Sequence, residues 1–212
     1  MMLKDKVALV TGGTSGIGRA TAIAYAQQQA KVVVVGRRMD EGEETVRLIK
    51  EAGGEAIFVQ ADVIKEADVK AMVDKAVSVF GRLDIAFNNA GTVGENPSLI
   101  EQTEAEYDRI TNVNIKGVWL SMKYEIAQML KQGSGSIVNT ASANGVVAFP
   151  TFPLYTASKH IDGFSVLHRE QKSVLNEFIT FAAVCLAAPW SLCRRPFTLY
   201  LNHDRFTIDI HS

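Results

Sequence analysis

Cysteine and histidine are scarce in this sequence, and their scarcity argues against two common ways of holding a small fold together. There are only two cysteines, Cys185 and Cys193, and both lie late in the chain. Neither they nor the four histidines have the spacing of a metal-binding motif. The sequence therefore predicts neither a structural disulfide nor a metal site.

Charge is modest in amount and nearly balanced in sign. The 212 residues contain 22 Lys and Arg against 23 Asp and Glu, which gives a formal net charge of −1 at pH 7. A nucleic-acid-binding surface or a disordered acidic tail would need an excess of one sign. We therefore expect no nucleic acid among the partners and a small neutral molecule as the substrate.

Long apolar runs are also missing. The longest late run, Phe178–Trp190, is too short to span a lipid bilayer. Residues 1–6 lead straight into a strand without the apolar stretch of a signal peptide. No membrane attachment is expected, and the predicted compartment is the cytoplasm.

The sequence does contain a regular alternation of short β-branched runs with longer segments of helical periodicity. This alternation is typical of βαβ units, which build a parallel sheet covered by helices. Five strands are expected, at Val7–Val10, Lys31–Val35, Ala56–Gln60, Leu83–Asn88 and Ser136–Thr140. Helices are expected between them, at Ala20–Gln29, Asp40–Ala52 and Lys65–Phe80. The predicted fold class is α/β: a Rossmann-type, doubly wound parallel sheet in three layers, with residues 1–212 as a single domain.

A glycine-rich turn follows the first predicted strand and leads directly into a helical segment. Glycines let the backbone turn tightly and approach a pyrophosphate, whose charge the free N–H groups of a helix N-terminus stabilise. An ordinary strand-to-helix turn is the alternative, but the N-terminal position between a strand and a helix favours phosphate binding. The residues expected to hold the cofactor here are Gly12, Thr14, Ser15, Gly16, Ile17 and Gly18.

The spacing of Gly12, Gly16 and Gly18 resembles that of the short-chain dehydrogenase/reductase family, and further landmarks of the family follow in order. They are Asp62-Val63, Asn88-Asn89-Ala90-Gly91, Asn114, Ser142 and Tyr155-Thr156-Ala157-Ser158-Lys159. The resemblance implies a nicotinamide-dependent oxidoreductase acting on a carbonyl or a secondary alcohol. It also implies that Asp62 and Val63 flank the adenine.

The same resemblance implies that Asn89, Ala90 and Gly91 line the ribose and phosphate side of the cofactor. The alternative for this segment is a simple strand end, because Asn and Gly are common turn formers.

The second predicted strand ends in Val35-Gly36-Arg37-Arg38, where the adenosine ribose of the cofactor would lie. NAD-dependent enzymes place an acidic side chain there to hold the ribose 2′-hydroxyl. Arg37 stands at that place, and a guanidinium binds a 2′-phosphate that a carboxylate would repel. The sequence therefore favours NADP, with Arg37 and Arg38 among the cofactor-binding residues. A solvated arginine pair with Asp40 close by is the other interpretation, and it leaves NAD as the alternative cofactor.

Reduction of a ketone needs a hydride on carbon and a proton on oxygen, so a side-chain acid must lie beside the carbonyl. An isolated phenol, with a pKa near ~10, exchanges its proton poorly at neutral pH, and a nearby cation lowers that pKa. Tyr155 and Lys159 supply such a pair if their segment is helical, because residues four apart share one helix face. For an isolated pair, a routine surface contact is the alternative.

The resemblance also implies roles for the remaining polar residues. Ser142 would hydrogen-bond the substrate oxygen, Asn114 would hold a water that connects Lys159 to solvent, and Lys159 would also grip the nicotinamide ribose. The alternatives are a capping hydroxyl for Ser142 and a helix-interior polar residue for Asn114. The predicted catalytic residues are Asn114, Ser142, Tyr155 and Lys159, and the last two are also expected to contact the cofactor. The apolar residues in Gly145–Leu154 predict a mostly hydrophobic substrate.

The resemblance is dense from about residue 5 to residue 160 and fades beyond it. Leu186-Ala187 stand where the family has a Pro-Gly turn beside the nicotinamide, and Trp190–Ser212 resembles nothing in the family. The chain also ends before the family's seventh strand. A reading-frame change, a truncation or misassigned residues each account for this pattern, and residues 165–212 are expected to be atypical.

Three functions remain open at this point. The first, favoured by the ordered set of catalytic residues, is an NADP-dependent oxidoreductase. The second is a protein that binds NADP(H) without turnover, because the altered C-terminal part does not build the substrate region. The third is an oligomeric scaffold. The resemblance implies a homo-oligomer, a dimer or a tetramer, formed through the helices near residues 100–130 and 155–178.

Overall fold

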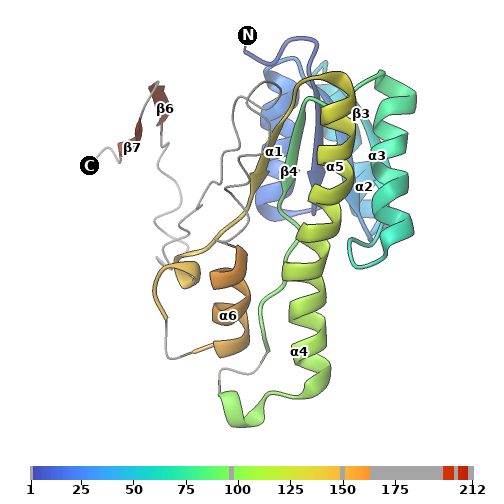
Figure 1. Ribbon diagram of the computed structural model, residues 1–212. Helices are drawn as coiled ribbons and strands as arrows, with labels where there is room; N and C mark the ends of the chain where they lie inside the picture. The colour runs from blue at the N-terminus through green and yellow to red at the C-terminus, as the bar shows by residue number, and fades with distance from the viewer. Residues whose placement is uncertain (1, 96–97, 149–150, 163–197, 203–204, 210–212) are drawn as a thin grey trace.

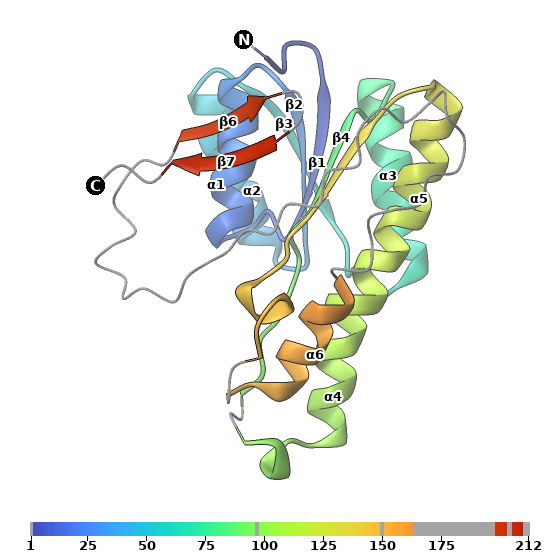
Figure 2. The ribbon, with the colours of Figure 1, turned by 60° about the vertical axis from the view of Figure 1, so that its left-hand side comes forward.

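The protein is a three-layer structure in which a central sheet lies between two layers of helices (Figures 1 and 2). The computed structural model describes residues 2–95, 98–148, 151–162, 198–202 and 205–209. The α/β fold class predicted from the sequence is confirmed.

The sheet has five parallel strands in the order β3-β2-β1-β4-β5. They are β1 Val7–Thr11, β2 Lys31–Gly36, β3 Glu55–Gln60, β4 Ile85–Asn88 and β5 Ser136–Asn139. All five predicted strands are present, and their ends differ from the prediction by one or two residues. The winding reverses at β1, with β2 and β3 on one side and β4 and β5 on the other. At such a switch point the connections leave in opposite directions and open a crevice at the carboxyl ends of the strands.

Helices cover both faces of this sheet (Figure 2). Their bounds are α1 Gly16–Gln27, α2 Met39–Glu51, α3 Glu66–Phe80 and α5 Val118–Gln132. The first two cover one face, and α3 and α5 cover the other. The three predicted helices are confirmed, although α1 begins earlier than expected, inside the glycine-rich turn. Among the described residues, no helix is long and apolar enough to cross a membrane.

Smaller elements extend the fold beyond the carboxyl ends of β4 and β5, below the sheet in Figure 1. After β4 come a short 3-10 helix, η1 Leu99–Glu101, then α4 Glu104–Thr111 and a π-helical turn, η2 Asn112–Gly117, that continues into α5. After β5 come a second short 3-10 helix, η3 Ala143–Gly145, and α6 Pro153–Asp162. Helix α6 packs against η3, α4 and η2. Two connections that leave neighbouring strands are thus brought together beside the crevice.

The core consists of two apolar clusters, one on each face of the sheet. In β1, Val7 and Leu9 join the cluster with α3 and α5, whereas Ala8 and Val10 join the cluster with α1 and α2. All four are at most 1% exposed. This follows from the alternation of side chains along a strand, which demands apolar residues at every position when both faces are covered. Burial of a Val or Leu side chain contributes roughly 1.5–3 kcal/mol, so the continuous apolar runs fix β1 and β2 at the centre of the fold.

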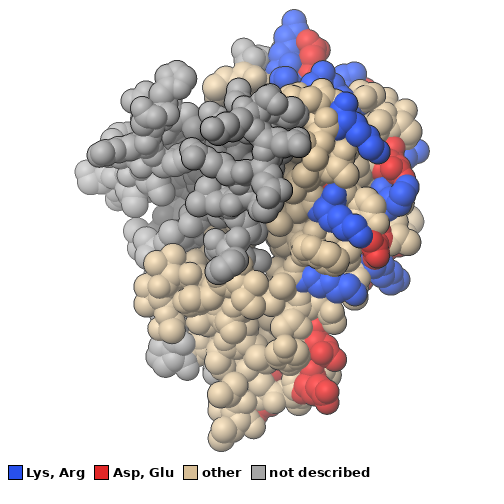
Figure 3. Space-filling view, in the orientation of Figure 1, with Lys and Arg blue, Asp and Glu red and all other residues tan. Residues whose placement is uncertain are grey.

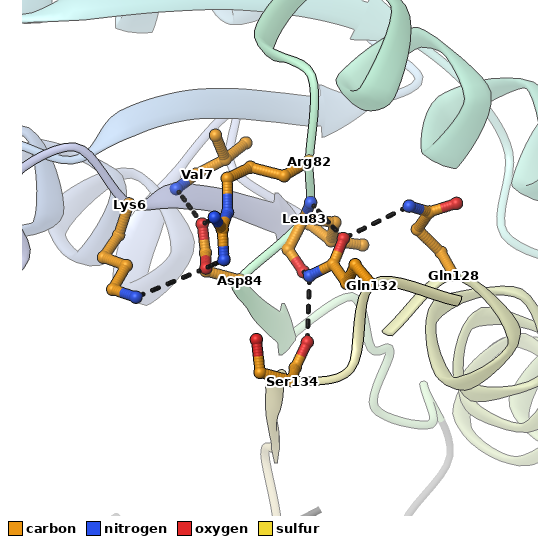
Figure 4. A network of polar contacts seen from close by, with 8 residues as sticks. All are labelled: Lys6, Val7, Arg82, Leu83, Asp84, Gln128, Gln132 and Ser134. Atoms are coloured by element: carbon orange, nitrogen blue, oxygen red, sulfur yellow. Dashed lines mark hydrogen bonds and ion pairs between the residues drawn. The ribbon is translucent and has the colours of Figure 1, made fainter. Parts of the chain in front are cut away.

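A buried carboxylate holds the amino ends of β1 and β4 (Figure 4). Asp84 is 5% exposed and accepts a hydrogen bond of 3.0 Å from the backbone N–H of Val7. It also accepts two from the Arg82 guanidinium, at 2.6 and 2.8 Å, and the Lys6 ammonium lies 3.5 Å away. Hydrogen bonds to a charged acceptor are stronger than neutral ones, so Asp84 ties two strands together at the end of the sheet opposite the crevice.

The start of β4 differs from the prediction, which placed it at Leu83 rather than Ile85. The side-chain amide of Gln132, the last residue of α5, accepts the Leu83 N–H at 3.1 Å and donates to the Leu83 carbonyl at 2.5 Å. Both backbone groups of Leu83 are therefore bonded to a side chain rather than to a neighbouring strand (Figure 4).

An antiparallel hairpin is formed by β6 Thr198–Asn202 and β7 Arg205–Asp209. It is a two-stranded sheet separate from the five-stranded one. The sequence predicts no element in this stretch, which resembles nothing in the family. The Leu186-Ala187 pair lies outside the described residues.

The Asp84 network leads to a prediction about stability. Asp84→Ala should lower the free energy of unfolding by about 2–3 kcal/mol, because the Val7 N–H and the Arg82 guanidinium lose a buried acceptor. Denaturant unfolding followed by circular dichroism measures the loss. The control is Asp74→Ala, which removes the exposed partner of Lys70 on α3 and should leave the midpoint nearly unchanged. Equal losses in both variants would contradict a special role for Asp84.

Candidate functional site

A cavity of about 460 Å³ opens at the carboxyl ends of β1, β2 and β4, where the switch point predicts a ligand. The predicted cofactor residues that line it are Gly12, Thr14, Ser15, Arg37, Arg38, Asp62, Val63, Asn89, Ala90 and Gly91. The remaining lining residues, which the sequence analysis does not assign, are Val35, Gly36, Ala61, Thr92, Arg109 and Val113. Of the predicted cofactor residues, Gly16, Ile17, Gly18, Tyr155 and Lys159 are not among the lining residues.

The glycine-rich turn needs glycine for two different reasons. Gly12 and Gly16 have φ angles of +66° and +53°, in the left-handed region that side chains disfavour. At Gly18 a Cβ atom would lie 2.2 Å from the carbonyl oxygen of Gly12, closer than any real contact. Gly18 thus allows the first turn of α1 to pack directly on the backbone of the loop, which brings the helix N-terminus to the cavity.

Arg19, which the sequence analysis did not single out, fastens this turn to α2. Its guanidinium donates to the carbonyl oxygens of Thr14 at 2.6 Å and Glu41 at 3.1 Å, and to the Thr45 hydroxyl at 2.9 Å. A planar group with several donors can join three acceptors from two segments. The signal in the sequence is the position of this arginine, directly after Gly18 at the start of a helix.

The two arginines at the end of β2 have different surroundings. Arg38 donates to the hydroxyls of Ser15 at 2.9 Å and Thr14 at 3.3 Å, and it forms an ion pair of 3.1 Å with Glu41. Arg37 is exposed at the cavity, and its guanidinium forms no hydrogen bond or ion pair within the part of the chain that the structure describes. Arg38 therefore helps to order the turn, whereas Arg37 has its donors available to a ligand.

Thr11, the last residue of β1, positions the segment after β4. Its hydroxyl accepts the backbone N–H groups of Asn89 at 3.0 Å and Ala90 at 3.1 Å. The Asn89 amide donates in return to the Thr11 carbonyl at 3.3 Å. The side chain of Asn89 is thus oriented by β1, and the two segments predicted to bind the cofactor line the same cavity.

Asn114 lies in the π-helical turn η2 and is completely buried. Its amide exchanges hydrogen bonds with the backbone of Thr92, at 2.8 Å to the N–H and 2.9 Å to the carbonyl, and donates at 2.9 Å to the Ser158 hydroxyl. Both amide protons are therefore bonded to protein acceptors. The helix-interior alternative describes its location correctly, but the side chain also joins the loop after β4 to α6.

Tyr155 and Lys159 lie four residues apart on α6. The segment is therefore helical, which is the condition for the two side chains to share one helix face. The Lys159 ammonium is buried and donates to the carbonyl oxygen of Thr140, just after β5, at 2.9 Å. The Tyr155 hydroxyl forms no hydrogen bond within the described ranges. Ser142 accepts the Asn144 N–H at 3.2 Å and caps η3, which matches the capping alternative and leaves its own proton for another acceptor.

Charged side chains are scarce beside α6. Where Figure 3 leaves this surface uncovered, it shows no Lys, Arg, Asp or Glu there, in contrast to the many charged side chains over the helices at the right. Val146 and Val147, next to η3, are 73% and 55% exposed. Phe152, just before α6, has a φ of +57°, which is uncommon for a residue with a side chain. Residues 149–150 of the predicted substrate wall lie outside the described residues.

Comparisons with known proteins agree with this arrangement. A family model described as short chain dehydrogenase matches residues 6–188, which extends past residue 160, where the sequence resemblance fades. An uncharacterized oxidoreductase from Thermotoga maritima is 44% identical over 159 residues, which cover 75% of this chain and 62% of that protein. A cyclohexanol dehydrogenase from an Acinetobacter species is 42% identical over 156 residues, which cover 74% of this chain and 62% of that protein.

A solved structure gives the same result at the level of the fold. The crystal structure of a short-chain dehydrogenase/reductase from Burkholderia phymatum in complex with NAD is similar, with a TM-score of 0.74 and 36% sequence identity. The match covers 77% of this chain and 58% of that one. The chain thus spans about three fifths of the length of the curated relatives it matches.

A buried carboxyl group lies behind the ends of β4 and β5. Glu125 on α5 is completely buried, and one of its oxygens accepts a hydrogen bond of 2.9 Å from the Asn88 amide, which also donates to Asn139 at 3.0 Å. The other Glu125 oxygen has no partner among the described residues. Burial raises the pKa of Glu125 from 4.5 to about 7, and the hydrogen bond from Asn88 opposes this rise only in part.

This group predicts a pH dependence of stability with a definite sign. Because the folded state holds the proton more tightly than the unfolded state, the contribution of Glu125 is fully present below pH 4.5 and is lost as pH rises through about 7. The difference corresponds to roughly 3 kcal/mol at most. Glu125→Gln, a neutral isostere, should therefore gain stability relative to the wild type between about pH 5 and about pH 8.

Thermal unfolding of both proteins at several pH values measures this effect. Glu66→Gln, on the exposed start of α3, is the control, since its carboxyl group is at the surface. Parallel curves for wild type and Glu125→Gln across this range would show that Glu125 is ionised in the folded protein at neutral pH.

Proposed function

We propose that this chain, which belongs to the short-chain dehydrogenase/reductase family, transfers a hydride between NADP(H) and a ketone or secondary alcohol. One observation carries the proposal: α6, with Tyr155 and Lys159, packs against the segments that hold Ser142 and Asn114, beside a cavity built on a glycine-rich turn. The three segments that carry Asn114, Ser142 and the Tyr155/Lys159 pair are thereby brought together on the side of the fold where a dinucleotide would extend.

The residues present fit a dinucleotide. The N-terminus of α1 offers N–H groups for a pyrophosphate, and Gly12 lines the cavity at a point where a Cβ atom would crowd Asn89 and Ala90. When bound, NADPH supplies the hydride that the protein itself lacks. Tyr155 then donates its phenolic proton to the substrate oxygen, and Ser142 donates a hydrogen bond to the same oxygen. Lys159, held by the Thr140 carbonyl, provides the positive charge that stabilises the phenolate left behind.

NADP is the proposed cofactor because of Arg37. Its guanidinium is exposed at the cavity without a partner in the described residues, next to the end of β2 where the adenosine ribose would lie. A guanidinium forms charge-assisted, often bidentate hydrogen bonds with a phosphate. The NAD bound in the similar Burkholderia phymatum protein keeps NAD as the alternative.

A hydrophobic alcohol or ketone is the proposed substrate. Val146 and Val147 expose apolar surface next to the loop of Ser142, and a cyclohexanol dehydrogenase is among the similar proteins. A homo-oligomer remains part of the proposal: Tyr107 on α4 and Trp119 on α5 are 51% and 55% exposed, on the helices through which the family resemblance implies association.

A second candidate function is cofactor binding without turnover. It is supported by the cavity itself, which is lined by residues of the adenosine and phosphate half and not by Tyr155, Lys159 or Ser142. Loss of NADPH absorbance with a series of cyclic and aliphatic ketones tests the main proposal. Tight NADPH binding without any oxidation would favour the second function.

Tyr155→Phe should abolish reductase activity while NADPH affinity stays within a few fold of the wild type. The hydroxyl donates its proton only in the chemical step, so its loss lowers kcat rather than binding. Steady-state kinetics and calorimetric titration with NADPH measure the two effects. Normal turnover by this variant would refute the assignment of Tyr155 as the proton donor.

Arg37→Asp should shift the preference from NADP towards NAD. The substitution replaces a phosphate-binding guanidinium by a carboxylate that accepts a ribose hydroxyl and repels a 2′-phosphate. The ratio of kcat/KM for the two cofactors measures the shift. Lys4→Asp, an exposed charge reversal before β1, is the control. An unchanged ratio in Arg37→Asp would transfer the role to Arg38 or favour NAD as the natural cofactor.

A further inference from the structure

Two hydroxyl groups lie between Tyr155 and Lys159 on α6, and both point into the protein. Thr156 is 8% and Ser158 1% exposed, whereas Ala157 between them is exposed. Each hydroxyl forms a hydrogen bond to a different neighbouring segment. One face of α6 therefore presents Tyr155 while the residues beside it are bonded to the surrounding structure.

Ser158 joins α6 to the π-helical turn. Its hydroxyl accepts the Asn114 amide at 2.9 Å and donates to the carbonyl oxygen of Tyr155 at 2.8 Å. A serine hydroxyl has one proton, and this proton is used by the backbone of Tyr155. A bond from a serine to a carbonyl of its own helix is common and local, but the bond from Asn114 crosses 44 residues of sequence.

Thr156 joins α6 to the loop that carries Ser142. Its hydroxyl accepts the side-chain amide of Asn144 at 2.9 Å, and the backbone N–H of Asn144 is bonded to the Ser142 hydroxyl at 3.2 Å. The contact is close, because a Cβ atom at Gly145 would lie 2.6 Å from the Lys159 carbonyl oxygen. Asn144 thus connects Ser142 with α6 through two hydrogen bonds.

We propose that Thr156 and Ser158 form a hydroxyl clamp: they are positioning residues that fix α6 against the segments of Ser142 and Asn114 and so set the distance from Tyr155 to the substrate oxygen. This inference rests on the proposed function. Productive catalytic geometry must be held within about 0.5 Å, and a hydrogen bond to a neighbouring segment restricts a helix in a way that apolar packing alone does not. Thr156 acts through Ser142, and Ser158 acts through Asn114.

Thr156→Val and Ser158→Ala each remove one hydroxyl with little change in volume. Each should lower kcat about tenfold or more while KM for NADPH stays within about twofold, because the chemistry and not the adenosine cavity is disturbed. Thr156→Ser keeps the hydroxyl and should retain the wild-type kcat. Ala157→Ser places a hydroxyl on the exposed face of the same helix and is the matched control. A kcat of Thr156→Val or Ser158→Ala within about twofold of the wild type would overturn the clamp, as would a Thr156→Ser variant as slow as Thr156→Val.

Double variants separate positioning from a general loss of structure. In a Ser142→Ala background Thr156→Val should lower kcat no further, because the group that it positions is already gone, whereas Ser158→Ala should still do so. Loss by the same factor in both backgrounds would mean a merely structural role and overturn the proposal.

Amide hydrogen exchange tests the clamp without turnover. Exchange in α6 should be faster in Thr156→Val and Ser158→Ala than in the wild type and in Ala157→Ser. Equal exchange in all four proteins would refute the clamp even in an active enzyme. Absence of hydride transfer in the wild type, with faster exchange in the two variants, would refute the proposed function instead and leave the contacts established as purely structural.

Discussion

The hydroxyl of Thr11 is the contact on which the rest of the site depends. It lies at the end of the central strand, where the connection from β1 turns one way and the connection from β4 turns the other. By accepting the N–H groups of Asn89 and Ala90, it bonds two partly buried donors that have left the sheet. Together with the bond from the Asn89 amide to the Thr11 carbonyl, this contact joins the two segments just beyond the end of the ladder between β1 and β4. The contact therefore joins β1 to Asn89 and Ala90, which line the cavity.

Two parts of the candidate site, the glycine-rich turn and the region of Tyr155, are held in place by different kinds of interaction. The glycine-rich turn owes its shape largely to its own backbone, as the positive φ angles of Gly12 and Gly16 and the close approach of Gly18 to Gly12 show. The half with Tyr155 is assembled from side-chain hydrogen bonds between segments that leave different strands, through Asn114, Thr156 and Ser158. Backbone geometry specified by glycines tolerates changes elsewhere in the chain. Contacts between distant segments depend on every element that positions them, so this half is the more sensitive one.

This difference explains how much the sequence could reveal. The strands, the first three helices and the glycine-rich turn are encoded by patterns within short windows, and all were predicted within a few residues. The start of β4 was misjudged because a distant glutamine, Gln132, takes the backbone bonds of Leu83. The roles of Arg19 and Thr11 were missed for the same reason, since most of their partners are adjacent only in space. The π-helical turn around Asn114 has no periodicity of its own that would distinguish it from an ordinary helix.

A buried polar cluster of Asn88, Asn139 and Glu125 links the carboxyl ends of β4 and β5. Asn88 and Asn139 are register partners at the last positions of β4 and β5, and the residues after them, Asn89 and Thr140, belong to the site. Apolar side chains at these positions would avoid the desolvation cost that Glu125 incurs. However, apolar side chains would not link two strand ends by hydrogen bonds in one fixed orientation. A small rotation at either strand end would move the Thr140 carbonyl, which binds the Lys159 ammonium. The polar cluster therefore lowers the stability of the core but fixes the direction in which the chain leaves β4 and β5.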